Sequence, residues 1–362
     1  MAKQRILITG GAGFIGSRLA RLLVERGNDV LCYDNLHPQV HGVLRPAAGA
    51  LFGPNGAGLV MGDVTDAAAL ASCVRYYDPE IIYHLAAETG TGQSHDEPTR
   101  YNSVNVIGTT NLVEAVRRHG RRVRRVMLAG SRSIYGEGAA SQAGGGICNA
   151  EPRMPEDMKR GDFALRNAAG AVVRPVPTPE WLPPKPASVY ASTKLMQEYL
   201  LGQCFTGTPV EVVVLRLQNV YGPGQSLSNP YTGVISIFSQ QIEAGLRLNI
   251  FEDGDIIRDF VFVDDVVCAF AAAADLAAAP GLPVNIGSGV ATSIRDMARA
   301  LLKLYGRDPE AHDVSGNFRV GDVRFAVADI SRARARLGWT PEVSFEQGLK
   351  RFWEWSSVAG QS

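Results

Sequence analysis

The sequence predicts an α/β protein with a doubly wound parallel sheet and a smaller α/β domain at the C-terminal end. Short apolar runs alternate with helical segments as far as about residue 130, which is typical of parallel strands joined by crossover helices. A glycine-rich loop follows the first run, and beyond residue 222 the segments become shorter and are interrupted by Pro, Gly and Asp. We therefore predict a Rossmann-type domain over 1–222 and a smaller domain over 223–362, with chain crossings between them.

The first strand and the loop after it carry a specific motif. Residues 5–9 are apolar and lead into Gly11-x-Gly13-x-x-Gly16, after which apolar residues recur at helical spacing as far as residue 26. In this strand–turn–helix order, small residues allow a tight turn, and the helix N-terminus faces a pyrophosphate. The motif predicts a dinucleotide site, and its expected loop contacts are Gly10, Gly13, Phe14, Ile15 and Gly16.

The second strand, residues 29–33, ends in Asp34. A carboxylate at this position binds the adenosine ribose diol and would repel a 2′-phosphate, so Asp34 predicts NAD rather than NADP. The alternative for Asp34 is a helix or turn cap. Further strands are expected at residues 59–61, 80–83 and 125–129. A last helix is expected after Ser344, which has capping-box spacing to Gln347.

Composition limits the classes of function. The 362 residues are 46% hydrophobic and 20% charged, enough for a large core, and the formal net charge of zero does not indicate a nucleic-acid partner. No apolar run reaches the ~18 residues of a membrane span. Residues 1–3 lead directly into the first strand and leave no room for a signal peptide, so a cytoplasmic location is expected. The five scattered cysteines predict reduced thiols and no metal site.

Tyr190 and Lys194 are the main catalytic candidates. They lie one helical turn apart, on one face of a helix, so the Lys194 cation is expected to lower the pKa of Tyr190 from its usual value of about 10. Ser131 precedes Tyr135 by four residues, just after the strand at 125–129. A Tyr-x-x-x-Lys spacing is common by chance. Together with the glycine loop and the serine, it predicts a tyrosine base beside a dinucleotide.

With these motifs the chain resembles the extended short-chain dehydrogenase/reductase family, in particular its nucleotide-sugar epimerases and dehydratases, over nearly its whole length. Residues 62–64 resemble the adenine-contacting turn, 84–87 the loop beside the cofactor, and 105–109 the central helix segment. His84 itself is interpreted as a core histidine rather than a catalyst. The resemblance implies NAD as cofactor, with further contacts from Asn35, Asp63, Val64, Leu85, Ala86, Ala87, Asn105, Tyr190 and Lys194.

The resemblance also implies a nucleotide-diphosphate sugar as substrate, bound largely by the smaller domain. Residues 219–223 and 258–261 resemble the diphosphate-binding elements, and 321–324 resemble the C-terminal arginine motif. Phe251 resembles the residue that packs on the substrate's base, with plain core packing as the alternative. The implied substrate contacts are Thr89, Ser131, Ser133, Asn219, Asn229, Phe251, Arg258 and Arg324.

The implied chemistry oxidises a sugar hydroxyl to a 4-keto group: Tyr190 takes the proton, Ser131 hydrogen-bonds the oxygen, and Lys194 also holds the nicotinamide ribose. Dehydratases of the family carry an Asp-Glu pair directly after the Ser/Thr position. Here those positions hold Arg132 and Ser133, which favours an epimerase unless Glu88 or Glu137 substitutes in the pocket. A 4-ketosugar reductase and a non-catalytic NAD-sensing scaffold remain alternatives from other classes.

A Gly-, Ala- and Pro-rich insert over about 137–187 separates Ser131 from Tyr190 by 59 positions. Such irregular segments are usually functional or disordered, and both a lid and a surface loop without a role stay open. The insert resembles one in enzymes similar to dTDP-L-rhamnose 4-epimerase, some of which have paired cysteines there. This chain keeps only Cys148, so no metal is expected. Segments 88–94 and 228–233 resemble the same group, with UDP-hexose and UDP-uronate 4-epimerases as the alternatives.

A homodimer is the expected assembly. The resemblance implies that the helices around 105–116 and 190–201 pair across a two-fold axis, and a two-fold dimer is the commonest soluble oligomer. The second helix carries Leu195, Tyr199 and Leu200 beyond what one buried face requires.

Overall fold

The computed structural model describes residues 3–42, 48–53, 56–142, 144–227, 233–275 and 282–359. Asn229, an expected substrate contact, lies outside the described residues. Among the helices in these ranges, none has the length and apolar composition of a membrane span. The described His, Cys, Asp and Glu side chains form no group of three or more that could hold a metal ion.

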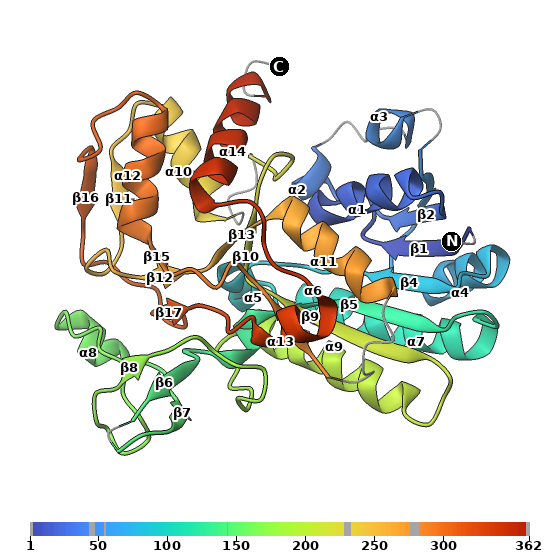
Figure 1. Ribbon diagram of the computed structural model, residues 1–362, viewed down its shortest axis with the longest axis horizontal. Coiled ribbons are helices and arrows are strands. Elements are labelled where there is room, and N and C mark those ends of the chain that lie inside the picture. The colour runs from blue at the N-terminus through green and yellow to red at the C-terminus, as the bar shows by residue number, and fades with distance from the viewer. Residues whose placement is uncertain are drawn as a thin grey trace.

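A seven-stranded parallel sheet forms the centre of the molecule (Figure 1). Its inner strands are buried on both faces, which is why they read as short, continuous apolar runs, whereas the edge strand β3 is largely exposed. The order β14-β9-β5-β4-β1-β2-β3 confirms the predicted doubly wound fold. The strands are β1 (Arg5–Thr9), β2 (Asp29–Asp34), β3 (Gly58–Met61), β4 (Ile81–His84), β5 (Arg125–Ser131), β9 (Glu211–Leu217) and β14 (Val284–Ile286).

Helices cover both faces of this sheet. One face packs on α1 (Phe14–Glu25), α11 (Val263–Asp275) and α13 (Ser331–Leu337), and the other on α4 (Ala67–Tyr77), α7 (Gly108–His119) and α9 (Val189–Phe205). Because β14, α11 and α13 come from the chain after residue 222, the C-terminal part crosses back into the large domain. The shorter elements near the sheet are α2 (Pro38–His41), α3 (Ala48–Phe52), α5 (Thr91–Asp96), α6 (Pro98–Tyr101), η1 (Asn102–Ile107) and η2 (Arg132–Tyr135).

The part of the chain predicted to form the smaller domain contains a further apolar cluster, built around Phe262, Leu301 and Phe352. Its last helix starts with the predicted capping box: Ser344 and Gln347 exchange backbone-to-side-chain hydrogen bonds of 3.2 and 3.3 Å. Its elements are α10 (Val234–Glu243), α12 (Ile294–Leu304), α14 (Phe345–Ala359), and the sheets β10 (Asn219–Tyr221)–β13 (Phe260–Phe262), β11 (Leu248–Ile250)–β16 (His312–Val314) and β15 (Thr292–Ser293)–β12 (Ile257–Arg258)–β17 (Phe325–Ala326).

The insert contains a small antiparallel sheet in the order β7 (Ile147–Asn149)–β6 (Ala139–Ser141)–β8 (Arg174–Pro175). The short helix α8 (Pro155–Lys159) lies between β7 and β8 in the chain. These strands have three residues or fewer, too few for a recognisable period of two, so the sequence predicted an irregular loop. Figure 1 shows the insert in green below β17 of the smaller domain. Phe325 of β17 packs against the insert core of Ala140 and Leu165.

Candidate active site

The glycine loop brings backbone close to backbone. A Cβ added at Gly10 would lie 2.6 Å from the amide nitrogen of Ala86, and one at Gly16 would lie 2.2 Å from the Gly10 carbonyl oxygen. Gly13 is the N-cap of α1 and supplies no side-chain cap. The first N–H groups of α1 therefore have no side-chain acceptor and point where a phosphate would be stabilised.

Asp34 ends β2 and is 8% exposed. Its carboxylate accepts hydrogen bonds from the backbone N–H of Ala12 at 3.0 Å and of Leu36 at 2.8 Å. It therefore supports the turn, as the alternative interpretation required, and it also lines the cavity that opens above the glycine loop. The two roles coexist, because a carboxylate has about four lone-pair positions. Loop and carboxylate together fit a dinucleotide with a free ribose diol.

The cavity above the loop measures about 450 Å³. It is lined by every predicted cofactor residue except Asn105. Sequence reasoning missed several residues on it; Ala129 and Gly130 could have been found, because ligands bind at the carboxyl ends of parallel strands. The predicted residues on this cavity are Gly10, Gly13, Phe14, Ile15, Gly16, Asp34, Asn35, Asp63, Val64, Leu85, Ala86, Ala87, Tyr190 and Lys194, with Thr89 of the substrate set. The missed ones include Tyr33, His37, Gln39, Arg100, Gln218 and Gln225.

A second cavity of about 250 Å³ adjoins the first. Ser133, Asn219 and Arg258 of the predicted substrate contacts line it. Ser131 and Tyr190 line both cavities, so the catalytic candidates lie at the junction. This arrangement would allow an alcohol in the second cavity to exchange the proton of its hydroxyl oxygen with the protein and the hydride of the carbon bearing that oxygen with a dinucleotide.

Local structure fixes the side chains of the catalytic candidates. Ser188 caps the N-terminus of α9 by accepting a hydrogen bond from the backbone N–H of Ala191 at 3.1 Å, so the helix starts just before Tyr190. The Tyr190 ring packs edge-on against Tyr101, with ring centroids 6.3 Å apart. Ser131 ends β5, and its hydroxyl oxygen lies 2.9 Å from that of Ser133. Strand end and helix start therefore position the two hydroxyls.

The electrostatics of Tyr190 differ from the sequence-based expectation. Burial raises the pKa of Tyr190, and hydrogen bonding with Ser131 opposes that rise. The expected lowering of this pKa by Lys194 is not found in this structure, because burial is the largest effect on Tyr190. The Lys194 ammonium donates to the Oε1 atom of Gln197 at 2.5 Å. Burial also lowers the pKa of Lys194 to about 8, with Glu198 acting in the opposite direction.

A buried polar network lies behind Lys194. The Gln197 amide nitrogen donates to the Thr109 hydroxyl at 2.8 Å, and that hydroxyl donates to the Asn105 carbonyl at 2.6 Å. Thr109 therefore accepts from Nε2 of His84 at 2.9 Å, and Nδ1 of His84 accepts from Thr9 at 2.7 Å. Burial, and then the charge of Lys194, lower the pKa of His84 to about 3. His84 is a neutral core histidine, as predicted, and the network orients the Gln197 carbonyl oxygen toward Lys194.

Gln197→Leu is expected to remove the buried acceptor of Lys194 and lower the Lys194 pKa below about 8. The alkaline limb of the kcat–pH profile then moves to lower pH, and kcat at pH 8 falls roughly tenfold, the size of one hydrogen bond to a charged group. Gln197→Glu adds an anion and is expected to move the same limb to higher pH. The other ionisable groups facing Lys194 are His84, Tyr190 and Glu198.

The matched control is Gln203→Leu, the same substitution at an exposed position of α9. It should leave the profile unchanged. Shifts of the same sign in Gln197→Leu and Gln197→Glu would contradict this assignment, because structural damage alone does not reverse direction with charge.

Asn105 lies behind the cofactor cavity and not on it. Its side chain is fully buried and accepts from the Glu88 backbone N–H at 2.8 Å, while its amide donates to the Glu88 carbonyl at 3.1 Å and to Thr193 at 2.9 Å. It sits in the π-helical turn η1, a kind of irregularity often found at functional sites. In this structure Asn105 supports the loop that carries Leu85 to Glu88, and a direct contact with the cofactor stays a prediction.

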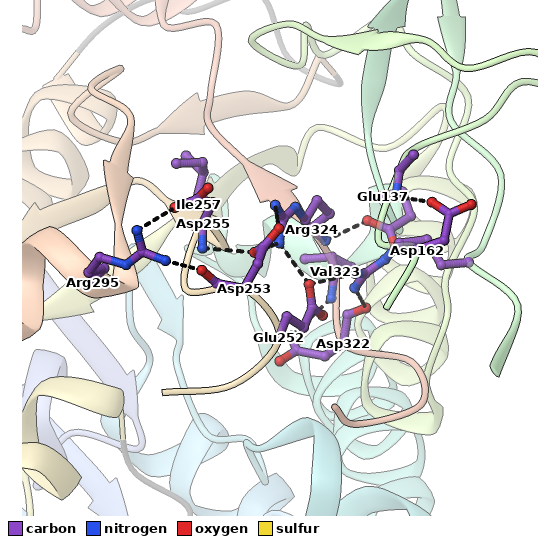
Figure 2. Close-up of polar contacts among 12 residues, drawn as sticks. Glu137, Asp162, Glu252, Asp253, Asp255, Ile257, Arg295, Asp322, Val323 and Arg324 are labelled. Carbon is purple, nitrogen blue, oxygen red and sulfur yellow. Dashed lines mark hydrogen bonds and ion pairs between the residues drawn. The ribbon is translucent and has the colours of Figure 1, made fainter. Parts of the chain in front are cut away.

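Arg324 is engaged inside the protein. Its guanidinium contacts the carboxylates of Glu252 at 2.9 Å and Asp253 at 2.5 and 2.7 Å (Figure 2). Glu252 is 1% exposed and also binds Arg153 of the insert at 2.8 Å. Arg324 lines neither of the two cavities described above. In this structure the Arg324 guanidinium therefore does not lie on the cavity where a diphosphate contact was expected.

Phe251 also lies away from the catalytic junction. It lines a separate depression together with Phe318, Arg319 and the insert residues Met158 and Lys159. The Arg319 guanidinium lies 5.1 Å from the centre of the Phe251 ring. Phe251 therefore has one side against the core of the smaller domain and another on a surface that the insert helps to form.

The two carboxylates left open by the sequence are both paired. Glu88 lines the first cavity and binds Arg100 at 2.8 Å. Glu137 binds Arg153 at 2.8 Å, accepts from the Arg324 backbone N–H at 2.6 Å, and does not line the second cavity. Burial raises the pKa of Glu137, and Arg153 opposes this. Neither carboxylate is placed as the second acid or base that a dehydratase needs.

Comparison with known proteins gives consistent results. Residues 6–155 match the NAD dependent epimerase/dehydratase family, and residues 170–352 match the GDP-mannose 4,6 dehydratase model. The chain is 44% identical to a dTDP-L-rhamnose 4-epimerase of Burkholderia thailandensis, over 97% of this chain and 94% of that protein. It is 34% identical to a UDP-glucose 4-epimerase of Mycolicibacterium smegmatis, over 96% and 97%. Its structure resembles the UDP-glucose 4-epimerase of Thermotoga maritima with UDP-glucose, with a TM-score of 0.80, 30% identity, and coverage of 98% and 99%.

Proposed function

The chain belongs to the NAD-dependent epimerase/dehydratase family, and from that premise we propose that it is a nucleotide-sugar 4-epimerase acting on a dTDP-6-deoxyhexose such as dTDP-L-rhamnose. The observation that carries the proposal is the junction of the two cavities. Ser131 and Tyr190 lie where the dinucleotide cavity meets a cavity lined by Asn219 and Arg258.

In this proposal the O4 hydroxyl of the sugar lies against Ser131 and Tyr190. Tyr190 removes the O4 proton, and Ser131 donates a hydrogen bond to the same oxygen; general-base catalysis of this kind contributes about 10²–10⁴ in rate. Bound NAD⁺ supplies the hydride acceptor and a cationic ring that favours the phenolate form of Tyr190. After the keto sugar turns over, Tyr190 returns the proton to O4 while the hydride returns to the opposite face of C4.

Glu88 is paired with Arg100 and Glu137 with Arg153, and this supports an epimerase over a dehydratase. Loss of water across C5 and C6 requires an acid and a base near those carbons, and Arg132 and Ser133 stand where dehydratases carry Asp and Glu. Of the carboxylates in the described part of the chain, Asp322 lines the second cavity, and it is paired with Arg258 at 2.7 Å.

The 44% identity to a dTDP-L-rhamnose 4-epimerase supports a dTDP-6-deoxyhexose as substrate. The second candidate is a UDP-hexose, supported by the fold shared with an epimerase that was solved with UDP-glucose. We keep Phe251 as the surface for the base in either case, since its ring lines a depression beside the insert.

Incubation with dTDP-L-rhamnose, UDP-glucose and UDP-glucuronate, followed by NMR of the C4 configuration, tests the function. The expected result is inversion at C4 of the dTDP-sugar, with no added NADH and no net change in NADH absorbance. Stoichiometric consumption or accumulation of NADH would indicate a 4-ketosugar reductase, and loss of the C6 hydroxyl from a hexose would indicate a dehydratase.

A homodimer through α7 and α9 is part of the proposal. Ile107 at the end of η1, just before α7, is 52% exposed, and Met196 and Tyr199 on α9 are 45% and 48% exposed. Leu195, expected on the same outer stripe, packs against the cluster that includes Leu182 of the chain's own insert. The exposed apolar surface is therefore narrower than the sequence indicated: it consists of Met196 and Tyr199 on α9 and Ile107 before α7, while the large apolar residues of α7 itself are buried.

Light scattering at micromolar concentration is expected to give about twice the 38.8 kDa monomer mass. Met196→Glu places a charge on the stripe and should shift the mass toward the monomer. A monomeric wild-type protein would contradict the dimer.

A cytoplasmic location is also part of the proposal, and cell fractionation tests it.

A further inference from the structure

The second cavity carries an excess of positive charge. Its charged lining residues in the described part of the chain are Arg132, Arg258 and Asp322. Nη2 of Arg258 donates to the Asp322 carboxylate at 2.7 Å, and Nη1 donates to the Val323 carbonyl at 2.8 Å. Arg258 and Asp322 therefore compensate each other, and the charge of Arg132 remains.

Arg132 has few partners for a guanidinium with five N–H donors. Within the ranges that the structure describes, it donates one hydrogen bond, to the Gly136 carbonyl at 2.8 Å, and it forms no ion pair. Burial and then the charge of Arg258 lower the pKa of Arg132 to about 10, while Glu137 and Asp322 act in the opposite direction. A partly buried cation with free donors is stabilised by an anion.

The nearby carboxylates are already bound to other arginines. Glu137 is 4% exposed and is held by Arg153 of the insert, whose guanidinium also donates to the Asp322 carbonyl at 2.8 Å. Asp322 holds Arg258. Glu252 and Asp253 hold Arg324 away from the cavity (Figure 2). The charge of Arg324, the expected phosphate ligand, is therefore neutralised by carboxylates, while Arg132 lines the cavity.

We propose that Arg132 is a substrate-binding residue that binds the diphosphate of the nucleotide sugar together with Arg258. It would take the role that the sequence motif assigned to Arg324. The inference rests on the proposed function. A diphosphate brings two negative charges to a cavity with one uncompensated cation, and guanidinium groups bind phosphate oxygens through two parallel hydrogen bonds. Arg132 directly follows Ser131, so it anchors the anion beside the catalytic hydroxyls while the keto sugar turns over.

Calorimetric titration of the NAD-loaded protein with dTDP, which carries the diphosphate but no sugar, tests this assignment. Arg132→Met is expected to weaken dTDP binding roughly tenfold to a hundredfold, the range for hydrogen bonds to charged groups. Arg132→Lys retains the charge without the two parallel donors and should lose less affinity. Arg124→Met removes the same charge from an exposed position next to β5 and should leave affinity unchanged.

The outcomes separate the two proposals. Wild-type protein that binds neither dTDP nor UDP would overturn the proposed function and this inference with it. Wild-type protein that binds dTDP as tightly as Arg132→Met does would overturn the inference alone. Weakened binding of dTDP-L-rhamnose with unchanged binding of dTDP would place Arg132 on the sugar and would also overturn it. Retention of NAD and an unchanged melting temperature would show that Arg132→Met is folded. If Arg132→Met does not fold, the comparison of Arg132→Lys with Arg124→Lys tests the same assignment.

Discussion

Tyr190→Phe lowers kcat by about 10²–10⁴-fold, the contribution expected of a general base, while NAD stays bound. The substitution removes the phenolic oxygen but keeps the ring, whose edge-on packing against Tyr101 has a centroid distance of 6.3 Å. The glycine loop and Asp34 are untouched, so cofactor affinity is expected to stay within about twofold. Single-turnover measurement of C4 inversion, together with quantification of bound NAD, checks both parts.

The matched control is Tyr199→Phe on the same helix. Tyr199 is 48% exposed and lines neither cavity, so its hydroxyl has no role in the proposed reaction. It should retain full turnover. If Tyr190→Phe also retained most of its activity, another group would have to remove the O4 proton.

Gly16→Ala is expected to have the second-largest effect, on cofactor binding. The new Cβ would lie 2.2 Å from the Gly10 carbonyl oxygen and 2.8 Å from the Gly11 Cα. Both neighbours are backbone atoms, so the start of α1 must move away from the loop. Overpacking of this kind costs about 1–3 kcal/mol, which, if it falls on the NAD-bound state, corresponds to a loss of NAD affinity of roughly fivefold to 150-fold. Titration of the apoprotein with NAD measures the loss.

Gly202→Ala provides the matched control. Gly202 lies inside α9, and a Cβ there would meet no heavy atom within 4 Å. Alanine in a helix is favoured over glycine by about 0.5–1 kcal/mol, so this variant should be slightly more stable and bind NAD normally. Equal NAD affinity in Gly16→Ala and Gly202→Ala would show that the close approach at Gly16 is not required.

The parts of the site that the sequence predicted are those defined over short distances along the chain. The run from β1 through Gly10–Gly16 into α1 is local, and so is the spacing of Tyr190 and Lys194. Asp34 follows from the end of the next strand. In a parallel sheet, the carboxyl ends of these strands meet at one edge, so local motifs are sufficient to place most of the cofactor cavity.

The charge balance of the second cavity, in contrast, depends on pairs that are far apart in the chain. Arg153 and Glu252 are 99 positions apart, and Arg324 and Glu252 are 72 apart. A sequence motif identifies an arginine but not the carboxylate that reaches it in the folded chain. The motif therefore pointed to Arg324, which is paired with Glu252 and Asp253, and not to Arg132, which forms no ion pair with any residue that the structure describes.

The sequence by itself determined the parallel sheet and the dinucleotide loop, and it supplied Ser131, Tyr190 and Lys194 as catalytic candidates, because short-range spacing and periodicity encode these features. Only the tertiary structure decided that Asn105 supports a loop, that Lys194 is bonded to Gln197, and that burial raises the pKa of Tyr190. Hydrogen-bond partners and burial arise when distant segments pack together, and they set the electrostatics that a motif cannot report.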